Sequence, residues 1–490
     1  MQNNSYLWRL YLVSTVLLLF GLGIGYKLFY LQFIDGDKYR KIALDKTLKS
    51  FVVSPVRGNI FSEDGSLLAT STTKYDIFFD SKTVPNRIFS SEIKSLSNEL
   101  SKHLGDDQTK WQKYLTDSRN NNNRYLSIIK NVDKEKVDLI KKLPIFKYGS
   151  IKGGLIIEKK IQREYPLGKV AERTIGYEKT DRNGNYWGVG LEHAYGSLLR
   201  GKNGKMTKRK ISNGQWKVLE SNLNKSPIDG LDINTTLNTY MQDIVHDYLL
   251  EQTEKFEANH STAVLMEVNT GKIKAISNFA RTDKGKYYEK LNYALGESIE
   301  PGSTFKLMTM IAALEDQVID TLQMIDTENG ELDFYGFKVR DSRKGGYGQI
   351  NAMDIFRLSS NTGMVKIISE AYKNQSEKFV NRLFNMGLNN SLNMEIKGEP
   401  NPKIPHPLDS SWNGLSLPWM SYGYGVSLTP LQILSFYNAV ANDGIMVKPT
   451  FIESSNKLGS LNIDTFKSQI INPNICSKET LSIVQKMLYD

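Results

Sequence analysis

One long apolar run, residues 10–33, constrains this chain more than any other feature of its sequence. The run has 24 residues, which corresponds to about 36 Å of α-helix and exceeds a hydrocarbon core of about 30 Å. Trp8 and Tyr30 lie near its ends, where membrane-spanning helices carry aromatic residues. A cleaved signal peptide is the alternative, but the run is long for one and no small-residue cleavage site follows promptly. The sequence therefore predicts one uncleaved anchor over residues 10–33, preceded by a short tail, residues 1–9.

The rest of the chain has the composition of a folded protein. Hydrophobic residues make up 40% and charged residues 24% of the 490 residues, which excludes a mostly disordered chain and a polytopic membrane protein. The net charge is +10, but the densest basic cluster, residues 202–210, lacks the interleaved aromatic residues of a nucleic-acid platform. Cys476 is the only cysteine, and the five histidines are scattered. We therefore expect no internal disulfide, no metal site and no nucleic-acid partner.

Strand-like and helix-like segments both follow the anchor. Asp64-Gly65 between apolar runs predicts a β-hairpin. Residues 90–143 look helical and charged, interrupted by a loop predicted over the polar residues 119–124. Residues 231–256 begin as a strand and become an amphipathic helix with Met241 on its apolar side. A second hairpin is predicted over residues 261–279.

A turn-rich segment, residues 225–230, is a candidate boundary. It divides the chain after the anchor into two predicted domains, residues 36–225 and residues 231–490.

Residues 300–306 read Glu-Pro-Gly-Ser-Thr-Phe-Lys and predict a helix that begins near Ser303. No charged residue lies between Lys306 and Glu315, so this helix should be buried. Residues i and i+3 share a helix face, so Lys306 can approach the Ser303 hydroxyl. Burial and the positive helix N-terminus both disfavour an ammonium group, so the pKa of Lys306 should fall. A neutral lysine could then take the serine proton, whereas the alternative is a lysine whose amine simply reaches solvent.

A second candidate segment, Ser359-Ser360-Asn361, lies between two predicted helices. A loop there can present Ser359 and Asn361 to a cleft. Short Ser-x-Asn and Ser-x-x-Lys patterns recur elsewhere in the chain, and capping of the second helix is the alternative role. The spacing alone leaves both interpretations open.

Six motifs, in the order of one known family, resemble those of class B penicillin-binding proteins over nearly the whole chain. The Ser-x-x-Lys set is an established signature of penicillin-binding proteins. The motifs are Arg57-Gly58-Asn59-Ile60 with Asp64-Gly65 and Leu68-Ala69, Arg163-Glu164-Tyr165-Pro166 with Ile175-Gly176-Tyr177, Gly190-Leu191-Glu192 with Leu199, Gly201 and Gly204, Glu300–Lys306, Ser359-Ser360-Asn361, and Tyr422-Gly423-Tyr424-Gly425 with Thr429-Pro430-Leu431-Gln432.

The resemblance implies an α+β fold class and a particular architecture. It consists of a single N-terminal transmembrane helix, an elongated pedestal over residues 36–225 that corresponds to the family's dimerisation domain, and a transpeptidase domain over residues 231–490. In that last domain, helices flank an antiparallel sheet.

The resemblance also implies a peptidoglycan D,D-transpeptidase. Ser303 would attack the penultimate D-alanine carbonyl of a stem peptide and release D-alanine, with Lys306 as general base. Ser359 would relay a proton toward the leaving amine, and Asn361 would orient the substrate amide. An amine of a neighbouring stem peptide would resolve the acyl-enzyme, and β-lactams would acylate Ser303 as substrate mimics. No cofactor or metal is implied.

The residues found in two of the motifs distinguish between two branches of the family. Ser-Ser-Asn followed by Thr-Gly, and Gly-Tyr-Gly at residues 423–425, resemble the division-specific, FtsI-type branch. The elongation branch usually has aspartate at the position of Asn361, and it is the alternative. The FtsI-type branch works beside a SEDS-family glycan polymerase and other membrane proteins of the division complex.

The resemblance and the flanking charges disagree on topology. Family members have a short cytoplasmic tail, an anchor in the cytoplasmic (inner) membrane and an extracytoplasmic or periplasmic catalytic domain. Here Arg9 precedes the anchor, whereas Lys38, Arg40 and Lys41 follow it, which by the positive-inside rule favours the opposite orientation. The motifs outweigh the charges, because the substrate to be cross-linked lies outside.

The family's third motif, Lys-(Thr/Ser)-Gly, does not occur in the sequence. In the family it supplies carboxylate-binding groups and one backbone N–H of the oxyanion hole, and loss of one such donor costs about 10²–10³ in rate. We therefore expect the 490 residues to be a fragment of a longer reading frame or a truncated product without transpeptidase activity. A non-catalytic division scaffold is an alternative from another class. A β-lactam sensor or β-lactamase is disfavoured by the long pedestal and the single span.

Overall fold

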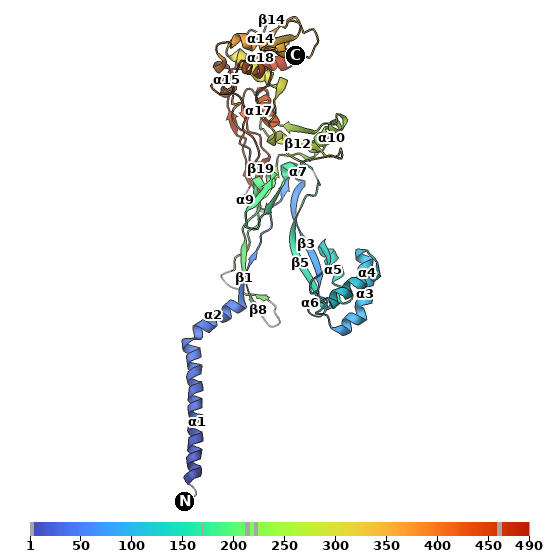
Figure 1. Cartoon of the computed structure of the whole chain (residues 1–490), viewed down its shortest axis with the longest axis vertical. Coiled ribbons are helices and arrows are strands. Elements are labelled where there is room, and N and C mark those ends of the chain that lie inside the picture. The colour runs from blue at the N-terminus through green and yellow to red at the C-terminus, as the bar shows by residue number, and fades with distance from the viewer. Residues whose placement is uncertain (1–3, 169, 211–215, 220–223, 458–462, 490) are drawn as a thin grey trace. The chain divides into compact units, whose positions relative to one another are not determined.

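The computed structural model describes the chain except residues 1–3, 169, 211–215, 220–223, 458–462 and 490. It divides into two compact units. Unit 1 comprises residues 1–56 and 201–230, and unit 2 comprises residues 57–200 and 231–490. The elements of both units are labelled in Figure 1.

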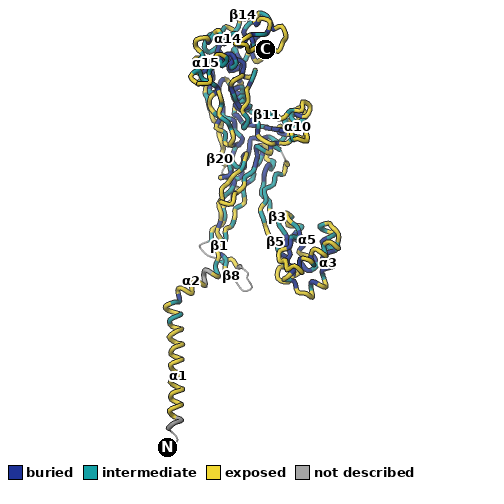
Figure 2. The backbone as a smooth tube through the Cα atoms, viewed as in Figure 1, coloured by how far each residue is buried: buried dark blue, intermediate teal, exposed yellow. Residues whose placement is uncertain are grey.

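Unit 1 contains the apolar run and a small antiparallel sheet with the strand order β1-β8-β9. Within the described residues, one helical stretch is long and apolar enough to cross a membrane, Leu7–Ile34, with a mean hydropathy of 1.9. It contains the predicted span, and Figure 2 shows it exposed along its length. The elements are α1 (Asn4–Phe29), a π-helical turn (Tyr30–Ile34), α2 (Gly36–Thr47), β1 (Leu48–Val53), β8 (Gly204–Lys210) and β9 (Trp216–Val218).

Unit 2 is built around a seven-stranded sheet whose strands come from distant parts of the sequence. The order is β20-β19-β10-β2-β3-β4, and β5 also pairs with β3. Ile233 of β10 pairs in parallel with Ile60 of β2, and Asp232 of β10 pairs antiparallel with Asn456 of β19. The strands are β2 (Ile60–Phe61), β3 (Leu67–Phe79), β4 (Leu126–Val132), β5 (Leu155–Glu164), β10 (Asp232–Thr235), β19 (Ile452–Asn456) and β20 (Ile463–Thr465).

The hairpin predicted at Asp64-Gly65 is confirmed, because β2 and β3 pair antiparallel around it. Gly65 has a φ of +82°, a left-handed conformation that glycine adopts without steric cost. Helices fill much of residues 90–143 as predicted, and the predicted loop is found directly after residue 120, but the strand β4 that follows this loop is not part of the prediction. Leu126 and Ile128 of β4 are buried at period two, so the strand pattern prevails locally.

A lobe of helices packs on the far ends of β3 and β5. Phe79 of β3 and Phe146 are fully buried and meet edge to face, with ring centroids 5.3 Å apart. The lobe's elements are α3 (Asn86–Leu104), α4 (Gln108–Asn120), α5 (Lys134–Ile140), a 3₁₀ turn (Phe146–Tyr148) and α6 (Gly149–Lys152). All of these segments except α6 contribute side chains to the shared core.

A buried charged cluster joins three of the sequence motifs in unit 2. Glu192, whose side chain is only 1% exposed, accepts hydrogen bonds from Arg57 Nε at 2.7 Å and from Arg163 Nε at 2.6 Å. Arg57 also donates to Glu178, which in turn pairs with Arg200. Because each buried carboxylate here is neutralised by guanidinium groups, the cluster holds the three motifs together as one network.

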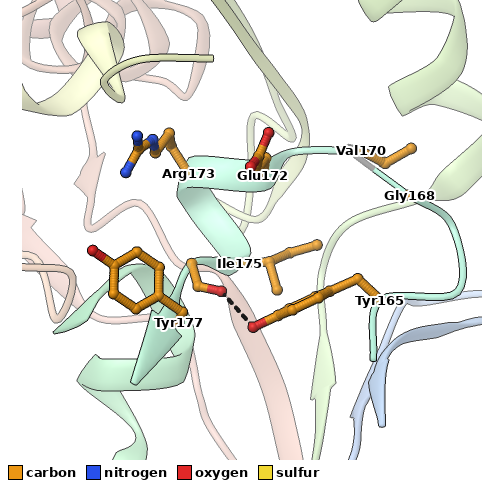
Figure 3. A pocket seen from close by; sticks show the side chains of 8 residues that line it. Tyr165, Gly168, Val170, Glu172, Arg173, Ile175 and Tyr177 are labelled. Carbon is orange, nitrogen blue, oxygen red and sulfur yellow. Dashed lines mark hydrogen bonds between the residues drawn. The ribbon is translucent and has the colours of Figure 1, made fainter. Parts of the chain in front are cut away.

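Tyr165 and the segment Ile175-Gly176-Tyr177, which belong to the same sequence motif, line an open cavity of about 330 Å³. Figure 3 shows Tyr165 pointing at the segment that ends in Tyr177, and its hydroxyl donates to the carbonyl of Gly176 at 3.0 Å. The surrounding elements are α7 (Glu172–Ile175), β6 (Tyr177–Thr180), β7 (Tyr186–Val189), α8 (Gly190–Ala194) and α9 (Gly196–Leu199).

The second predicted hairpin is confirmed as β11 and β12 of a three-stranded antiparallel sheet, β11-β12-β13, with α10 packed on it. The predicted strand and helix over residues 231–256 are confirmed as β10 and α10. Met241, however, is 39% exposed, and Gln242 faces the sheet instead. Its side-chain amide binds the backbone N–H and C=O of Ile276. The elements are α10 (Thr239–Lys255), β11 (His260–Met266), β12 (Ile273–Arg281), β13 (Tyr287–Tyr288) and α11 (Tyr293–Gly296).

A helical body completes unit 2 around α12, whose residues 306–313 are all buried, as predicted. Phe305, Phe379 and Phe436 are fully buried around it. The elements are a 3₁₀ turn (Gly302–Phe305), α12 (Lys306–Glu315), β14 (Met324–Asp326), β15 (Glu331–Phe334), β16 (Phe337–Arg340), β17 (Gln349–Asn351), α13 (Ala352–Arg357), α14 (Asn361–Ala371), α15 (Ser376–Asn385), α16 (Ser416–Ser421), α17 (Pro430–Ala441), β18 (Met446–Val447), β21 (Ile470–Asn472) and α18 (Lys478–Tyr489).

Candidate functional site

Ser303 lies in a 3₁₀ turn, not in the first turn of an α-helix as predicted. The turn spans Gly302–Phe305, and α12 begins at Lys306, whose backbone N–H donates to the carbonyl of Ser303. Pro301 precedes the turn, and Gly302 has a φ of +55°, so the chain is tightened just ahead of the serine. Residues i and i+3 of a 3₁₀ turn are eclipsed, which keeps Ser303 and Lys306 on one side. Ser303 is exposed, whereas Lys306 is 1% exposed.

The amine of Lys306 is held by the second candidate segment. Its Nζ atom donates to the carbonyl oxygen of Ser359 at 2.6 Å, to the Ser359 hydroxyl at 2.9 Å and to Asn361 Oδ1 at 2.6 Å. In the part of the chain that the structure describes, it makes no hydrogen bond to Ser303. Burial lowers the pKa of Lys306 from its ordinary value to about 8, against an opposing effect of the negative charge of Asp341. The expected lowering of this pKa is therefore found, and burial is its cause.

Within the segment 359–361, one residue caps a helix and its two neighbours contact Lys306. Ser360 is the N-cap of α14, because its hydroxyl accepts from the backbone N–H of Gly363 at 3.0 Å. Ser359 has a φ of +52°, a left-handed conformation that is rare for a non-glycine residue. This turn directs Ser359 and Asn361 to Lys306 while Ser360 points the other way. The capping interpretation thus holds for Ser360 and not for Ser359.

Asp341 is a member of the site that the sequence reasoning missed. It directly follows β16, and its carboxylate accepts from the backbone N–H groups of Asn361 and Thr362 at 2.6 and 3.0 Å. It also accepts from the hydroxyls of Ser360 and Thr362. A carboxylate at a helix N-terminus is favoured by the unpaired N–H groups and the positive end of the dipole. Asp341 lies about twenty residues before the helix that it caps, so no local pattern could reveal it.

The Gly-Tyr-Gly motif packs directly against the turn that carries Ser303. The backbone N–H of Gly302 donates to the carbonyl of Gly423 at 3.0 Å. A Cβ atom on Gly423 would lie 1.9 Å from the carbonyl oxygen of Gly302, so only glycine fits. Tyr437 of α17 donates to the carbonyl of Thr304 at 3.0 Å. α17 itself is fixed by a capping box between Thr429 and Gln432.

These contacts define what the site can do chemically. A lysine amine whose pKa is near 8 is partly neutral at physiological pH, so it can take and return a proton. When neutral, it can donate to the two carbonyl-type oxygens and keep its lone pair for a hydroxyl, either that of Ser359 or that of Ser303. Among the described side chains, no group of three or more His, Cys, Asp or Glu residues could hold a metal ion.

Two family models match the chain in sequence order. The penicillin-binding protein dimerisation domain matches residues 52–235, and the penicillin-binding protein transpeptidase domain matches residues 261–490. The chain therefore belongs to the penicillin-binding proteins that carry a dimerisation domain ahead of a transpeptidase domain.

Named relatives include class B members. The chain is 26% identical to stage V sporulation protein D of Bacillus subtilis, with 88% of this chain and 65% of that protein covered. It is 26% identical to the peptidoglycan D,D-transpeptidase FtsI of Escherichia coli, with 90% of this chain and 72% of that protein covered. The chain thus spans slightly less than two thirds of the sporulation protein's length.

A solved structure supports the fold. Penicillin-binding protein 2X from Streptococcus thermophilus has a TM-score of 0.71 and 23% identity, and the match covers 90% of this chain and 66% of that chain. The predicted α+β fold class is thereby confirmed.

Proposed function

We propose that the chain is a peptidoglycan D,D-transpeptidase, or the greater part of one, that acts through an acyl-enzyme on Ser303. The observation that carries the proposal is the buried amine of Lys306. Its three hydrogen bonds tie it to Ser359 and Asn361, and it lies one 3₁₀ turn after an exposed serine. A pKa near 8 suits a base that must be neutral to act.

In the proposed reaction, neutral Lys306 accepts the proton of the Ser303 hydroxyl as its oxygen attacks the penultimate D-alanine carbonyl. The C–N bond to the terminal D-alanine breaks, and the Ser359 hydroxyl passes a proton from Lys306 to the leaving amine. Asn361, whose side-chain oxygen accepts from Lys306, orients the substrate amide. An amine of a second stem peptide then displaces Ser303, which regains its proton.

The setting of this activity is part of the proposal. The apolar helix Leu7–Ile34 would anchor the chain in the cytoplasmic membrane as a single span, with the catalytic domain outside. The domain limits 36–225 and 231–490 belong to the proposal as well. A division-specific role beside a SEDS-family glycan polymerase is also proposed. Asn361 and the Gly-Tyr-Gly sequence at residues 423–425 favour this role, and the name FtsI among the relatives supports it.

The test is to incubate the purified chain with a saturating fluorescent penicillin and to map the adduct by peptide mass spectrometry. Because the chain lacks the Lys-(Thr/Ser)-Gly motif, we expect acylation to be slowed by about 10²–10³-fold, so that a long incubation yields an adduct on the peptide that contains Ser303 and none in a Ser303→Ala variant. Thr304→Ala is the matched control, because it removes a neighbouring hydroxyl and should still label. An adduct elsewhere, persistent labelling of Ser303→Ala, or no adduct after long incubation would each overturn acylation of Ser303 by this chain.

A further inference from the structure

The chain's net positive charge is concentrated in unit 1. Residues 1–56 and 201–230 hold 14 of the 63 Lys and Arg residues but only 5 of the 53 Asp and Glu residues, a net charge of +9 out of +10. The remainder of the chain is therefore almost neutral. A charge imbalance confined to one small unit marks an interaction surface more clearly than the same excess spread over the whole chain.

Within unit 1, one face of the sheet β1-β8-β9 carries three exposed cations. Lys205 and Arg209 lie four residues apart on β8, and Lys217 on β9 pairs directly opposite Arg209. Val52, the partner of Lys205 on β1, is 70% exposed on the same face. We call these four residues the cationic face.

Within the described residues of unit 1, none of the three cations of the cationic face forms an ion pair, although like charges directly opposite one another destabilise a sheet. Lys49 and Lys208 on the other face also pair directly opposite one another, but both lie over the ring of Phe51, at 5.7 and 4.8 Å from its centroid. The cations of the cationic face are therefore the ones available to anions from outside the chain.

Connectivity keeps the cationic face near the end of the apolar helix. Only α2, a helix of 12 residues and about 18 Å, lies between Ile34 and the sheet, apart from Asp35. α2 contacts both β1 and β8. Lysine and arginine beside an exposed apolar side chain suit the interface of a bilayer, where phosphate groups meet the first acyl carbons.

We propose that the cationic face docks on the anionic phospholipid headgroups of the membrane that the apolar helix crosses. The ligand is the lipid phosphodiester, bound by Lys205, Arg209 and Lys217, with Val52 at the level of the acyl carbons. This inference rests on the proposed anchoring but not on the proposed transpeptidase reaction. The docked sheet would fix the first β-strand after the span at the membrane surface.

The test is lysine acetylation of the full chain inserted in nanodiscs, read residue by residue by mass spectrometry. Insertion is verified first by co-elution with the nanodisc, so that failed anchoring is recognised separately. In nanodiscs that contain phosphatidylglycerol, we expect Lys205 and Lys217 to react about fivefold more slowly than in phosphatidylcholine nanodiscs. Lys49 and Lys210 on the opposite face control for the general field of the anionic surface and should change less. Exposed Lys134 and Lys373 should not change.

Three further arms separate lipid from other anions. In about 1 M salt, where the screening length falls to about 3 Å, the protection should disappear. Arg209→Glu should abolish protection of Lys205 and Lys217, whereas Lys134→Glu should not. Inorganic phosphate added to phosphatidylcholine nanodiscs should give no protection. Equal reactivity of Lys205 and Lys217 in both nanodiscs, equal protection of both faces, or full protection by free phosphate would overturn the proposal. The first of these outcomes would instead favour an acidic protein partner.

Discussion

The backbone N–H of Asn361 donates a 2.6 Å hydrogen bond to the carboxylate of Asp341, while the side chain of the same asparagine accepts from Lys306. A single residue thus joins the helix cap to the buried amine. The carboxylate also raises the pKa of Lys306 by its charge, although burial outweighs that effect. Asp341 therefore acts on the proposed base in two ways, by positioning it and through its field.

Asp341→Asn separates these two effects. The amide keeps the size of the side chain but removes the charge, so the pKa of Lys306 should fall further below 8. The acid limb of the pH profile of penicillin acylation should move to lower pH, while the maximal rate falls because the cap is weakened. The loss of charged hydrogen bonds should also reduce the free energy of unfolding by about 1–3 kcal/mol. Asp333→Asn, on the same hairpin, is the control. An acid limb that does not move would show that Asp341 is only structural.

The unsubstituted chain should show a pH-dependent acylation rate governed by Lys306. The reactive form is the neutral amine, so the rate should rise tenfold per pH unit well below the pKa of about 8 and level off above it. Stopped-flow acylation between pH 6 and pH 10 measures this limb, and the pH range brackets that value. A rate that is independent of pH in this range would contradict the assignment of Lys306 as the base.

Ser359→Ala and Ser360→Ala should have opposite consequences. Ser360 caps α14, so its loss should lower the free energy of unfolding by about 1 kcal/mol and leave most of the acylation rate. Ser359 contacts the amine, so its loss should lower the rate of penicillin acylation by about 10²-fold with little change in stability. Thermal unfolding and penicillin acylation are measured on both variants. The roles assigned here fail if the two variants show the same profile.

Gly423→Ala and Gly425→Ala form a matched pair in one motif. Both glycines have positive φ, +92° and +71°, so both variants bear the strain of a left-handed alanine. Only Gly423 would place a Cβ against Gly302, since nothing lies within 4 Å of a Cβ on Gly425. We expect Gly423→Ala to cost about 2–3 kcal/mol more in unfolding free energy and to slow acylation by displacing Ser303. Equal effects of the two substitutions would contradict a steric clash between a Cβ atom at position 423 and Gly302.

Glu192→Gln tests the charged cluster of the pedestal. It would leave Arg57 and Arg163 facing a neutral amide in a buried site, which should cost about 3–5 kcal/mol in the free energy of unfolding. Glu99→Gln removes a partly exposed carboxylate that pairs with Lys102 on α3, and it should have no measurable effect. Urea unfolding of the three chains gives the comparison. A small effect at Glu192 would mean that the cluster adds little to stability.

Local patterns predicted much of the architecture and only part of the site. The two hairpins and the buried helix after Lys306 follow from turn residues and hydrophobic pattern, and they are found. The sequence pattern does not predict strand β4, because this short alternating segment lies among charged helices. Hydrophobicity alone predicts that Met241 faces inward, whereas Gln242 is the buried residue because its side chain hydrogen-bonds to a strand.

The site shows the same limit. Lys306 and Ser359 could be singled out by residue type and spacing, but their contact depends on a left-handed turn at Ser359 that no residue preference announces. Asp341 belongs to the site only through tertiary structure, since its partners lie on the next helix but one. Sequence therefore gives the reacting groups more readily than the residues that hold them.

The pairing of β10 with both β2 and β19 has a consequence for biosynthesis. When a ribosome has made the first two hundred residues, β2 still lacks the neighbour that covers one of its edges. That neighbour, β10, follows near residue 232, and its own second edge stays open until residue 456 has been synthesised. The nascent chain must therefore keep exposed strand edges from mispairing for most of its translation, so this sheet is where a holdase chaperone would have the longest engagement.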